Sequence, residues 1–396
     1  SDDFPKIINE IIDSGFKKGA KFFQPNLLKI AIRNLNVGIN DPAYIRKSWR
    51  LIQEFYKSLK GEDSYNVYCI IEHYHIDKLL TCTKQNLINA YHELKDLYSK
   101  QHKRVQGKLR FVDFNQGVDA RLFTQEKVQL LSKIAIKPLR IAFDNVKTEK
   151  YYVEAIKMSV RAGLKDFSNY LLYNFDDRPE DLYYRLKINI DLSDELGISI
   201  YSFPMKYHPI RKTNDMNEDF SHNRDYIGKY WNRKYIRAIQ AILNSTKGKI
   251  GKGHSFFTKA FGGDINQYYK ILEMPETMII YRLFFEWLGQ KSGQETAIRI
   301  LGNDSICKNS TQSWWKSFQT CKKNLLPDEW QEVVNFIHKN NFDSTTCDKF
   351  SKKQIKELLS FYSNFRKTIL EEKSDLYKLK KAYDNNPIQK LKHNIK

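Results

Sequence analysis

A repeated pattern limits the possible folds of this chain more than any other feature: a short apolar run ends in polar residues, and a helix-like stretch follows. The runs lie at residues 109–115, 139–144, 168–174 and 198–203. Each is rich in β-branched and aromatic residues and almost continuously apolar, which is typical of strands buried on both faces of a parallel sheet. We therefore expect an α/β fold whose polar strand ends gather along one edge.

The segments between these runs carry helix signals. Thr124 is placed to cap an amphipathic stretch over residues 127–133. A second helix is expected over residues 148–162, where Gly163 ends it, and a third over residues 177–196, with Pro179 in its first turn. The repeat of about 25 to 35 residues has the size of a βα unit. Four such units form half of an eight-unit barrel or an open sheet.

Composition adds a domain plan and a charge. The 396 residues carry a formal charge of +20 and 14% aromatic residues, which is enough chain for several domains with sizeable cores. We expect a mainly helical segment over residues 1–107, βα units over 108–212, a basic helical region over 213–290 and a helical C-terminal region over 291–396. Apolar runs long enough to span a membrane do not occur, and five scattered cysteines favour a reduced, cytoplasmic protein.

The positive charge is densest over residues 222–259, where nine Lys and Arg accompany one acidic residue. Basic side chains interleaved with Tyr and Trp suit a phosphate backbone with stacked bases. A solvated cationic helix is the alternative interpretation of the same pattern. The candidate nucleic-acid contacts are Arg224, Lys229, Trp231, Arg233, Lys234 and Arg237.

Four segments at the expected strand ends also resemble a known family. They read VDFNQGVDARL over 112–122, PLRIAFD over 138–144, NYLLYNFDDRPEDL over 169–182 and FPMKYHP over 203–209. Together they are similar to the later strands of radical S-adenosylmethionine (SAM) enzymes. The resemblance implies an α/β fold with a partial parallel (β/α) barrel, about half of a radical SAM barrel, and helical N- and C-terminal extensions. It also implies SAM bound against a [4Fe-4S] cluster, with a 5′-deoxyadenosyl radical abstracting a substrate hydrogen.

The cysteines depart from that family. Radical SAM enzymes hold the cluster with Cys-x3-Cys-x2-Cys, whereas no two cysteines here lie closer than thirteen residues. We therefore expect no metal ligands in this chain. Since the chain also begins at Ser1 without an initiator methionine, we expect a C-terminal fragment that is inactive alone, with the cluster-binding half of the barrel upstream.

The resemblance assigns roles to residues at the strand ends. Asp144 is the first candidate for the SAM ribose or amino group, and Arg121 is a candidate for a carboxylate. An Asp119–Arg121 ion pair that only fixes a loop is an equal alternative, and a structural role is the favoured one for His208. The candidate cofactor residues are Asp144, Asn115, Gln116, Asp119, Arg121 and Asn174, and the candidate substrate residues are Met205, Tyr207 and His208.

Two interpretations of function follow. The first is the SAM- and substrate-facing half of a radical SAM enzyme, with an unidentified substrate. The second is a non-enzymatic nucleic-acid-binding protein that uses its basic aromatic helical surface, with the half barrel as a scaffold. Because the substrate of such an enzyme can itself be a nucleic acid, the two interpretations are compatible.

Overall fold

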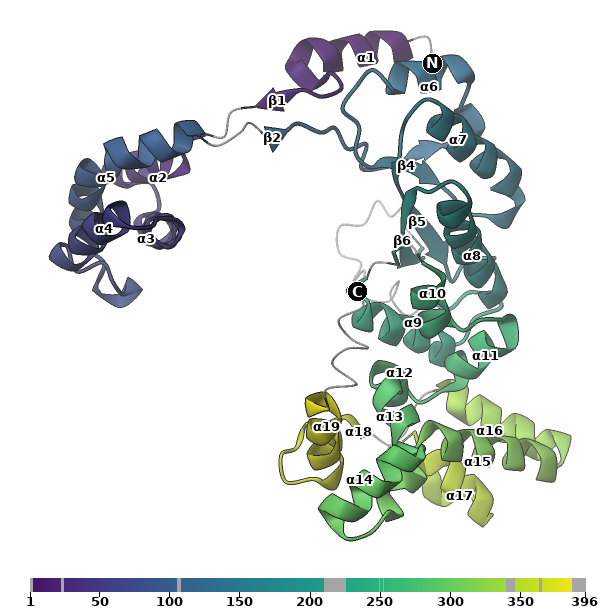
Figure 1. The fold of residues 1–396 in the computed structure, drawn as a ribbon. Coiled ribbons are helices and arrows are strands. Elements are labelled where there is room, and N and C mark those ends of the chain that lie inside the picture. The colour runs from purple at the N-terminus through teal and green to yellow at the C-terminus, as the bar shows by residue number, and fades with distance from the viewer. Residues whose placement is uncertain are drawn as a thin grey trace, which may run out of the picture. The chain divides into compact units, whose positions relative to one another are not determined.

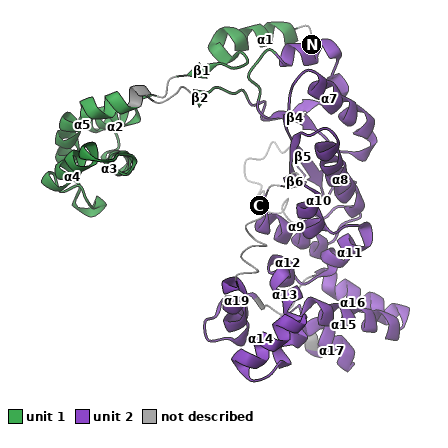
Figure 2. Cartoon of the chain, viewed as in Figure 1, with its two compact units in different colours: residues 1–112, 133–136 green, residues 113–132, 137–396 purple. Residues whose placement is uncertain are grey.

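The structure is a computed structural model that describes residues 3–22, 25–104, 108–209, 226–248, 250–251, 253–339, 346–362 and 365–386. The chain forms two compact units, shown in two colours in Figure 2. Unit 1 comprises residues 1–112 and 133–136, and unit 2 comprises residues 113–132 and 137–396. The expected N-terminal helical segment therefore lies in unit 1, while all the expected βα helices belong to unit 2.

Unit 1 is mainly helical (Figure 1). A π-helical turn, η1 (Ile12–Phe16), follows the first helix, and β1 pairs with β2 in an antiparallel ribbon. Leu28, Ile52, Val67, Leu87 and Leu94 form part of one apolar core between α2 and α5. The bounds are α1 (Phe4–Ile11), β1 (Lys21–Phe22), α2 (Leu27–Asn36), α3 (Asp41–Ser58), α4 (Glu62–His73), η2 (Leu79–Thr81), α5 (Lys84–Arg104) and β2 (Lys108–Leu109).

Unit 2 begins with a four-stranded parallel sheet in the order β3-β4-β5-β6. Its strands pair in register, with Leu139 opposite Phe167 and Ser168 opposite Tyr201. The expected parallel α/β sheet is thus present. The bounds are β3 (Val118–Asp119), η3 (Ala120–Leu122), α6 (Gln125–Leu131), β4 (Leu139–Ala142), η4 (Val146–Thr148), α7 (Glu149–Arg161), β5 (Asp166–Tyr173), α8 (Pro179–Glu195) and β6 (Ser199–Lys206).

The first expected strand, over residues 109–115, is wrong. Leu109 ends the antiparallel ribbon, Val112 forms a single parallel bridge with Ile136, and the sheet itself starts at Val118. The apolar run is interrupted by Arg110 and Asp113, and Asp113 is used for an ion pair with a neighbouring strand. As a result, Asn115 and Gln116 lie in the turn before β3 instead of at the end of a strand.

The helices expected between the strands are present with nearly the expected bounds. Thr124 accepts a hydrogen bond from the Lys127 amide and so caps α6, as its position predicted. Helix α8 starts at Pro179, and Asp181 accepts a hydrogen bond from the Arg178 amide. Because the strands follow one another in sequence order, right-handed crossovers place α7 and α8 on the same face of the sheet (Figure 1).

A helical region follows the sheet in unit 2 (Figure 1). Helix α9 is capped by Asn232, which accepts from the Tyr235 amide. The bounds are α9 (Arg233–Ser245), α10 (His254–Phe261), α11 (Ile265–Glu273), α12 (Glu276–Ile280), α13 (Arg282–Leu288), α14 (Lys291–Leu301), η6 (Ser305–Asn309), α15 (Thr311–Asn324), α16 (Pro327–Lys339), η7 (Thr346–Lys349), α17 (Lys353–Ser360), α18 (Phe365–Leu370) and α19 (Asp375–Asn385).

Candidate functional site at the sheet

The two faces of the sheet have different surroundings. On the face toward α7 and α8, Asn169 donates to the Tyr152 hydroxyl at 2.8 Å, and Asn189 donates to the Ser202 hydroxyl at 2.8 Å. These side chains are buried and form a polar network between the sheet and the helices. The other face, called here the second face, carries alternate residues of the same strands. Its residues are Asp119, Arg140, Asp144, Ser168, Tyr170, Tyr201, Phe203 and Met205.

An arginine and two aromatic rings form the centre of the second face. The Arg140 guanidinium lies 5.2 Å from the Tyr170 ring centroid and 6.0 Å from that of Phe203. Asp113 holds this guanidinium through two hydrogen bonds, at 2.7 and 2.8 Å. The same bonds lower the pKa of the Asp113 carboxyl. Tyr170 also donates to the Asn115 side-chain oxygen at 3.4 Å. The arrangement is therefore a fixed cation stacked on half-exposed rings.

The sequence analysis did not single out Arg140, Tyr170 or Phe203. Their signal is the alternation of polar or aromatic residues with aliphatic ones in β4 to β6, which marks two unlike faces. Beneath them lies Ser168, which is only 2% exposed, and its hydroxyl has no hydrogen-bond partner among the described residues. A buried polar atom without a partner is costly, so the Ser168 hydroxyl is an unsatisfied polar group within the sheet.

The parallel topology places the C-terminal ends of β3 to β6 on one edge of the sheet, called here the rim. At the end of β3, the Arg121 guanidinium and the Asp119 carboxylate approach to 2.6 Å. The hydrogen bonds from Arg121 lower the pKa of the Asp119 carboxyl. The structural ion pair that the sequence left as an alternative is thus present. Gln116 is exposed in the preceding turn.

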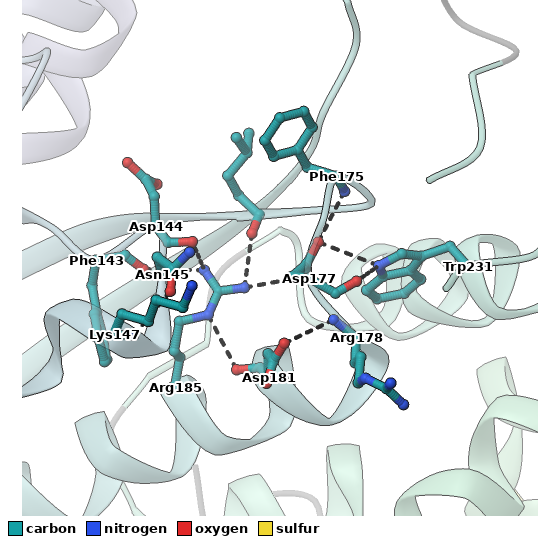
Figure 3. A network of polar contacts seen from close by, with 11 residues as sticks. Phe143, Asp144, Asn145, Lys147, Phe175, Asp177, Arg178, Asp181, Arg185 and Trp231 are labelled. Carbon is teal, nitrogen blue, oxygen red and sulfur yellow. Dashed lines mark hydrogen bonds and ion pairs between the residues drawn. The ribbon is translucent and has the colours of Figure 1, made fainter. Parts of the chain in front are cut away.

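Asp144 follows β4 and continues the alternation of Arg140, so its carboxylate belongs to the second face. Its backbone carbonyl points the other way and accepts from Arg185 at 3.0 Å (Figure 3). Although the residue is exposed to solvent, the surrounding protein desolvates its carboxyl and raises the pKa. The charge of Arg185 opposes this shift, whereas the charge of Asp119 adds to it. The negative charge of Asp119 therefore acts on the Asp144 carboxyl.

Arg185 anchors the backbone of the rim (Figure 3). This fully buried residue of α8 donates to the carbonyls of Phe143, Asp144 and Leu172 at 3.1, 3.0 and 2.8 Å. It also forms an ion pair with Asp177 at 3.3 Å. One side chain thereby fixes the ends of β4 and β5 relative to α8. The sequence signal for this residue, which was missed, is a cation among the mainly apolar residues of the buried face of α8.

Asn174 follows β5 and has a structural role. It is fully buried, and its side chain accepts from the Gly228 amide at 2.9 Å and donates to the Tyr226 carbonyl at 3.1 Å. Its φ of 72° is left-handed, a conformation that Asn adopts more readily than most residues. A Cβ on Gly228 would lie 2.4 Å from the Phe175 carbonyl oxygen, so only glycine fits there. The amide of Asn174 is therefore occupied by protein.

The end of β6 contributes an aromatic cluster. The Tyr207 amide donates to the Tyr173 carbonyl at 2.8 Å, which extends the pairing of β5 and β6. The Tyr207 ring lies 4.5 Å from that of Phe175 and 5.5 Å from that of Tyr226, measured between centroids. Met205 is 47% exposed on the second face, and His208 is exposed two residues beyond β6. The rim thus combines acids at β3 and β4 with aromatic rings at β6.

Two of the six candidate nucleic-acid contacts are buried in the structure. Trp231 is 6% exposed, and its indole donates to the Asp177 carbonyl at 2.9 Å. Lys234 is fully buried, donates to the Leu272 carbonyl at 3.0 Å, and has a pKa lowered to about 8 by burial. The expectation that these two side chains face a nucleic acid is therefore wrong, because both are buried and donate hydrogen bonds to main-chain carbonyls.

The other four basic candidates have different positions. Lys229, Arg233 and Arg237 are exposed, and Arg237 forms an ion pair with Glu276 at 2.8 Å. Lys229 lies 5.3 Å from the Tyr230 ring centroid. Arg224 lies outside the described residues. The start of α9 thus presents exposed basic side chains, but Trp231 is not part of this surface.

The side chains present can be compared with the needs of the two expected cofactors, the [4Fe-4S] cluster and SAM. Within the described ranges, His, Cys, Asp and Glu side chains form no group of three that would hold a metal ion. Cys69, Cys82, Cys307 and Cys321 are free thiols distributed over both units, so they do not fit an iron-sulfur cluster. The second face carries carboxylates, a guanidinium and aromatic rings, which are the kinds of group that contact the ammonium, carboxylate and adenine groups of ligands.

Comparisons with known proteins gave no assignment. The chain matches no protein-family model, no curated protein and no solved structure. In the part of the chain that the structure describes, no helix is both long and apolar enough to cross a lipid bilayer.

Proposed function

We propose that the sheet of unit 2 is the SAM-binding part of a radical SAM enzyme and that the cluster ligands come from outside this chain. The observation that carries the proposal is the sequential order of four parallel strands with α7 and α8 on one face. In a (β/α) barrel, the helices lie outside and the opposite face lines the interior, where ligands bind at the C-terminal rim. The second face would be that interior.

The residues of the second face supply recognition. Asp144 would accept hydrogen bonds from the SAM ammonium or ribose, and its raised pKa reflects the desolvation that strengthens such contacts. Tyr170 and Phe203 present rings to adenine, and Arg140 is held in place by Asp113. Bound to a cluster, SAM supplies radical chemistry. We infer a cytoplasmic location as part of this proposal, because an iron-sulfur cluster and free cysteine thiols are expected in a reducing compartment.

Binding of SAM to the chain tests this proposal. Titration calorimetry should give a Kd below about 1 mM, which corresponds to about −4.1 kcal/mol. Asp144→Asn should weaken binding about tenfold, because a neutral amide loses the charge-assisted contact. Asp176→Asn is the matched control, since Asp176 is an exposed acid in the loop after β5. S-adenosylhomocysteine, which lacks the sulfonium charge, should bind more weakly than SAM. Equal affinities of Asp144→Asn and the parent chain would contradict the proposal, as would absence of SAM binding.

A further inference from the structure

A basic pocket of about 420 Å³ lies within unit 2, where β6 ends. Lys206 comes from the last position of β6, Arg233 and Arg237 from α9, and Arg366 from α18. Glu276 of α12 is the one carboxylate among the lining residues that the structure describes. Four elements far apart in the sequence therefore bring an excess of positive charge to one concave site.

The fold accounts for the position of these side chains on α9. Arg233, Arg237, Gln240 and Asn244 follow one another at intervals of three or four residues, so they lie on one face of the helix. The opposite face buries Ala238, Ile239 and Ile242 and holds α9 against the rest of unit 2. Burial of one face thus fixes the direction of the polar face.

The rim supports the opposite wall of this pocket. Ile227 lines the pocket, and its neighbours on both sides are held by Asn174 through the Tyr226 carbonyl and the Gly228 amide. The residue that the sequence assigned to cofactor binding therefore positions a wall of a separate cavity.

The chemistry of the lining selects the ligand class. Guanidinium groups bind phosphate through paired hydrogen bonds, and a lysine adds a point charge. The amides of Gln240 and Asn244 offer neutral donors and acceptors beside these charges. A volume of about 420 Å³ suits a small molecule, because ligand pockets typically measure about 300 to 1,000 Å³.

We propose that this pocket binds the phosphate group of a nucleotide-sized phosphate ester. The site differs from the second face, so the proposal does not depend on SAM binding. Arg233 and Lys206 attract the phosphate from two walls, while Glu276 orients Arg237 by their 2.8 Å ion pair and limits the net charge. The phosphate comes either from a free nucleotide or from the 5′ end of a strand, and both sources share this chemistry.

Titration calorimetry of the full chain tests the pocket at about 0.15 M salt, where the Debye length is about 8 Å and diffuse attraction is reduced. Pyrophosphate should bind saturably, and 5′-AMP should bind more tightly than adenosine. A short oligonucleotide with a 5′ phosphate is compared with its 5′-hydroxyl twin. Preference for the phosphorylated strand over 5′-AMP identifies a strand end as the source, and the reverse order identifies a free nucleotide.

Two substitutions, one that removes a positive charge and one that removes a negative charge, distinguish binding in the pocket from general electrostatic attraction. Arg233→Gln should raise the Kd for pyrophosphate about tenfold, equivalent to about 1.4 kcal/mol. Glu276→Gln removes the negative charge of the lining and should lower that Kd. Arg299→Gln is the matched control, because Arg299 is an exposed arginine of α14 that does not line the pocket. Thermal unfolding of each variant checks the fold. An equal rise in the Kd for pyrophosphate in Arg233→Gln and Arg299→Gln would overturn the proposal. Lack of saturable pyrophosphate binding would overturn it too.

Discussion

In unit 1, the core between α2 and α5 consists of apolar side chains, and Ser48 is the one buried polar residue of this unit among those described. The sheet region of unit 2, by contrast, buries Arg185, Asn174, Asn169 and Asn189. Both regions bury side chains away from water, but the buried side chains have different roles. The first core holds helices together, whereas the second also fixes loop backbone.

Two of these buried polar residues, Arg185 and Asn174, contact main-chain atoms at or near strand ends. Arg185 holds the carbonyls that follow β4 and precede the end of β5, and Asn174 holds the segment around Gly228. Apolar contacts are non-directional and leave a loop free to shift, whereas hydrogen bonds set distances and angles. The comparison shows that directional contacts fix the backbone at the rim, including the carbonyl of Asp144, whereas the buried core of unit 1 is built from apolar side chains.

The largest expected effect comes from Arg185→Met. It leaves three carbonyls and the Asp177 carboxylate without their buried donor, so the free energy of unfolding of unit 2 should fall by about 3–5 kcal/mol. Urea unfolding followed by tryptophan fluorescence measures this loss, since Trp49 is the only one of the six tryptophans in unit 1.

Lys187→Met on the same helix is the control for Arg185→Met. Lys187 is 44% exposed in its side chain and forms an i,i+4 pair with Asp191, so its loss should cost no more than about 0.5 kcal/mol. A loss below about 1 kcal/mol for Arg185→Met would mean that other donors replace the guanidinium. The contrast between directional and apolar burial would then fail.

Leu28→Ala probes the other side of the comparison. Leu28 is fully buried in the apolar core of unit 1, so the cavity should cost about 2–5 kcal/mol. Leu28→Met should cost less than about 1.5 kcal/mol, because an apolar core tolerates changes that conserve volume. Hydrogen exchange of the α3 and α5 amides reports both losses. Leu80→Ala is the control, since Leu80 is 99% exposed. Similar losses for Met and Ala at residue 28 would show that shape, and not volume, specifies this core.

The sequence predicted the elements whose information is local. Periodicity and cap residues placed α6, α7 and α8 within a few residues, and apolar runs placed β4 to β6. The run over 109–115 is the exception, because it does not form one strand and its Asp113 pairs with Arg140 of β4. That pairing is a contact between distant segments, and no local pattern specifies it.

The candidate site was predictable in the same measure. The common edge of the strand ends followed from parallel topology, and the place of Asp144 followed with it. The difference between Asp144 and Asn174 did not, because both follow a strand, yet the three-dimensional path of residues 226–228 buries only Asn174. Trp231 and Lys234 were mispredicted for a related reason, because composition counts charges and rings but not their directions. The helix phase of α9 buries Lys234, and Trp231, which precedes α9, packs against Tyr173.

The smallest expected effect is a pH dependence that Lys234 confers on unit 2. Burial lowers the pKa of this lysine to about 8, with Arg237 adding to the shift while Glu276 and Glu273 oppose it. In the unfolded chain the pKa is about 10.4. Between these values the unfolded chain binds more protons, so unfolding free energy rises with pH, by no more than about 3 kcal/mol in total. Below about pH 8 both states are protonated, and the contribution is constant.

Lys234→Met removes this titration, so the difference in unfolding free energy between the parent chain and the variant should shift in favour of the parent from pH 8 to 10.5. The subtraction cancels buried tyrosines such as Tyr268, whose raised pKa acts in the opposite direction. Lys229→Met is the control, because Lys229 is exposed five residues earlier. Parallel curves for the parent and Lys234→Met would show that Lys234 titrates normally. The buried lysine of unit 2 would then add no pH dependence to the unfolding free energy, and this difference from the apolar core of unit 1 would be lost.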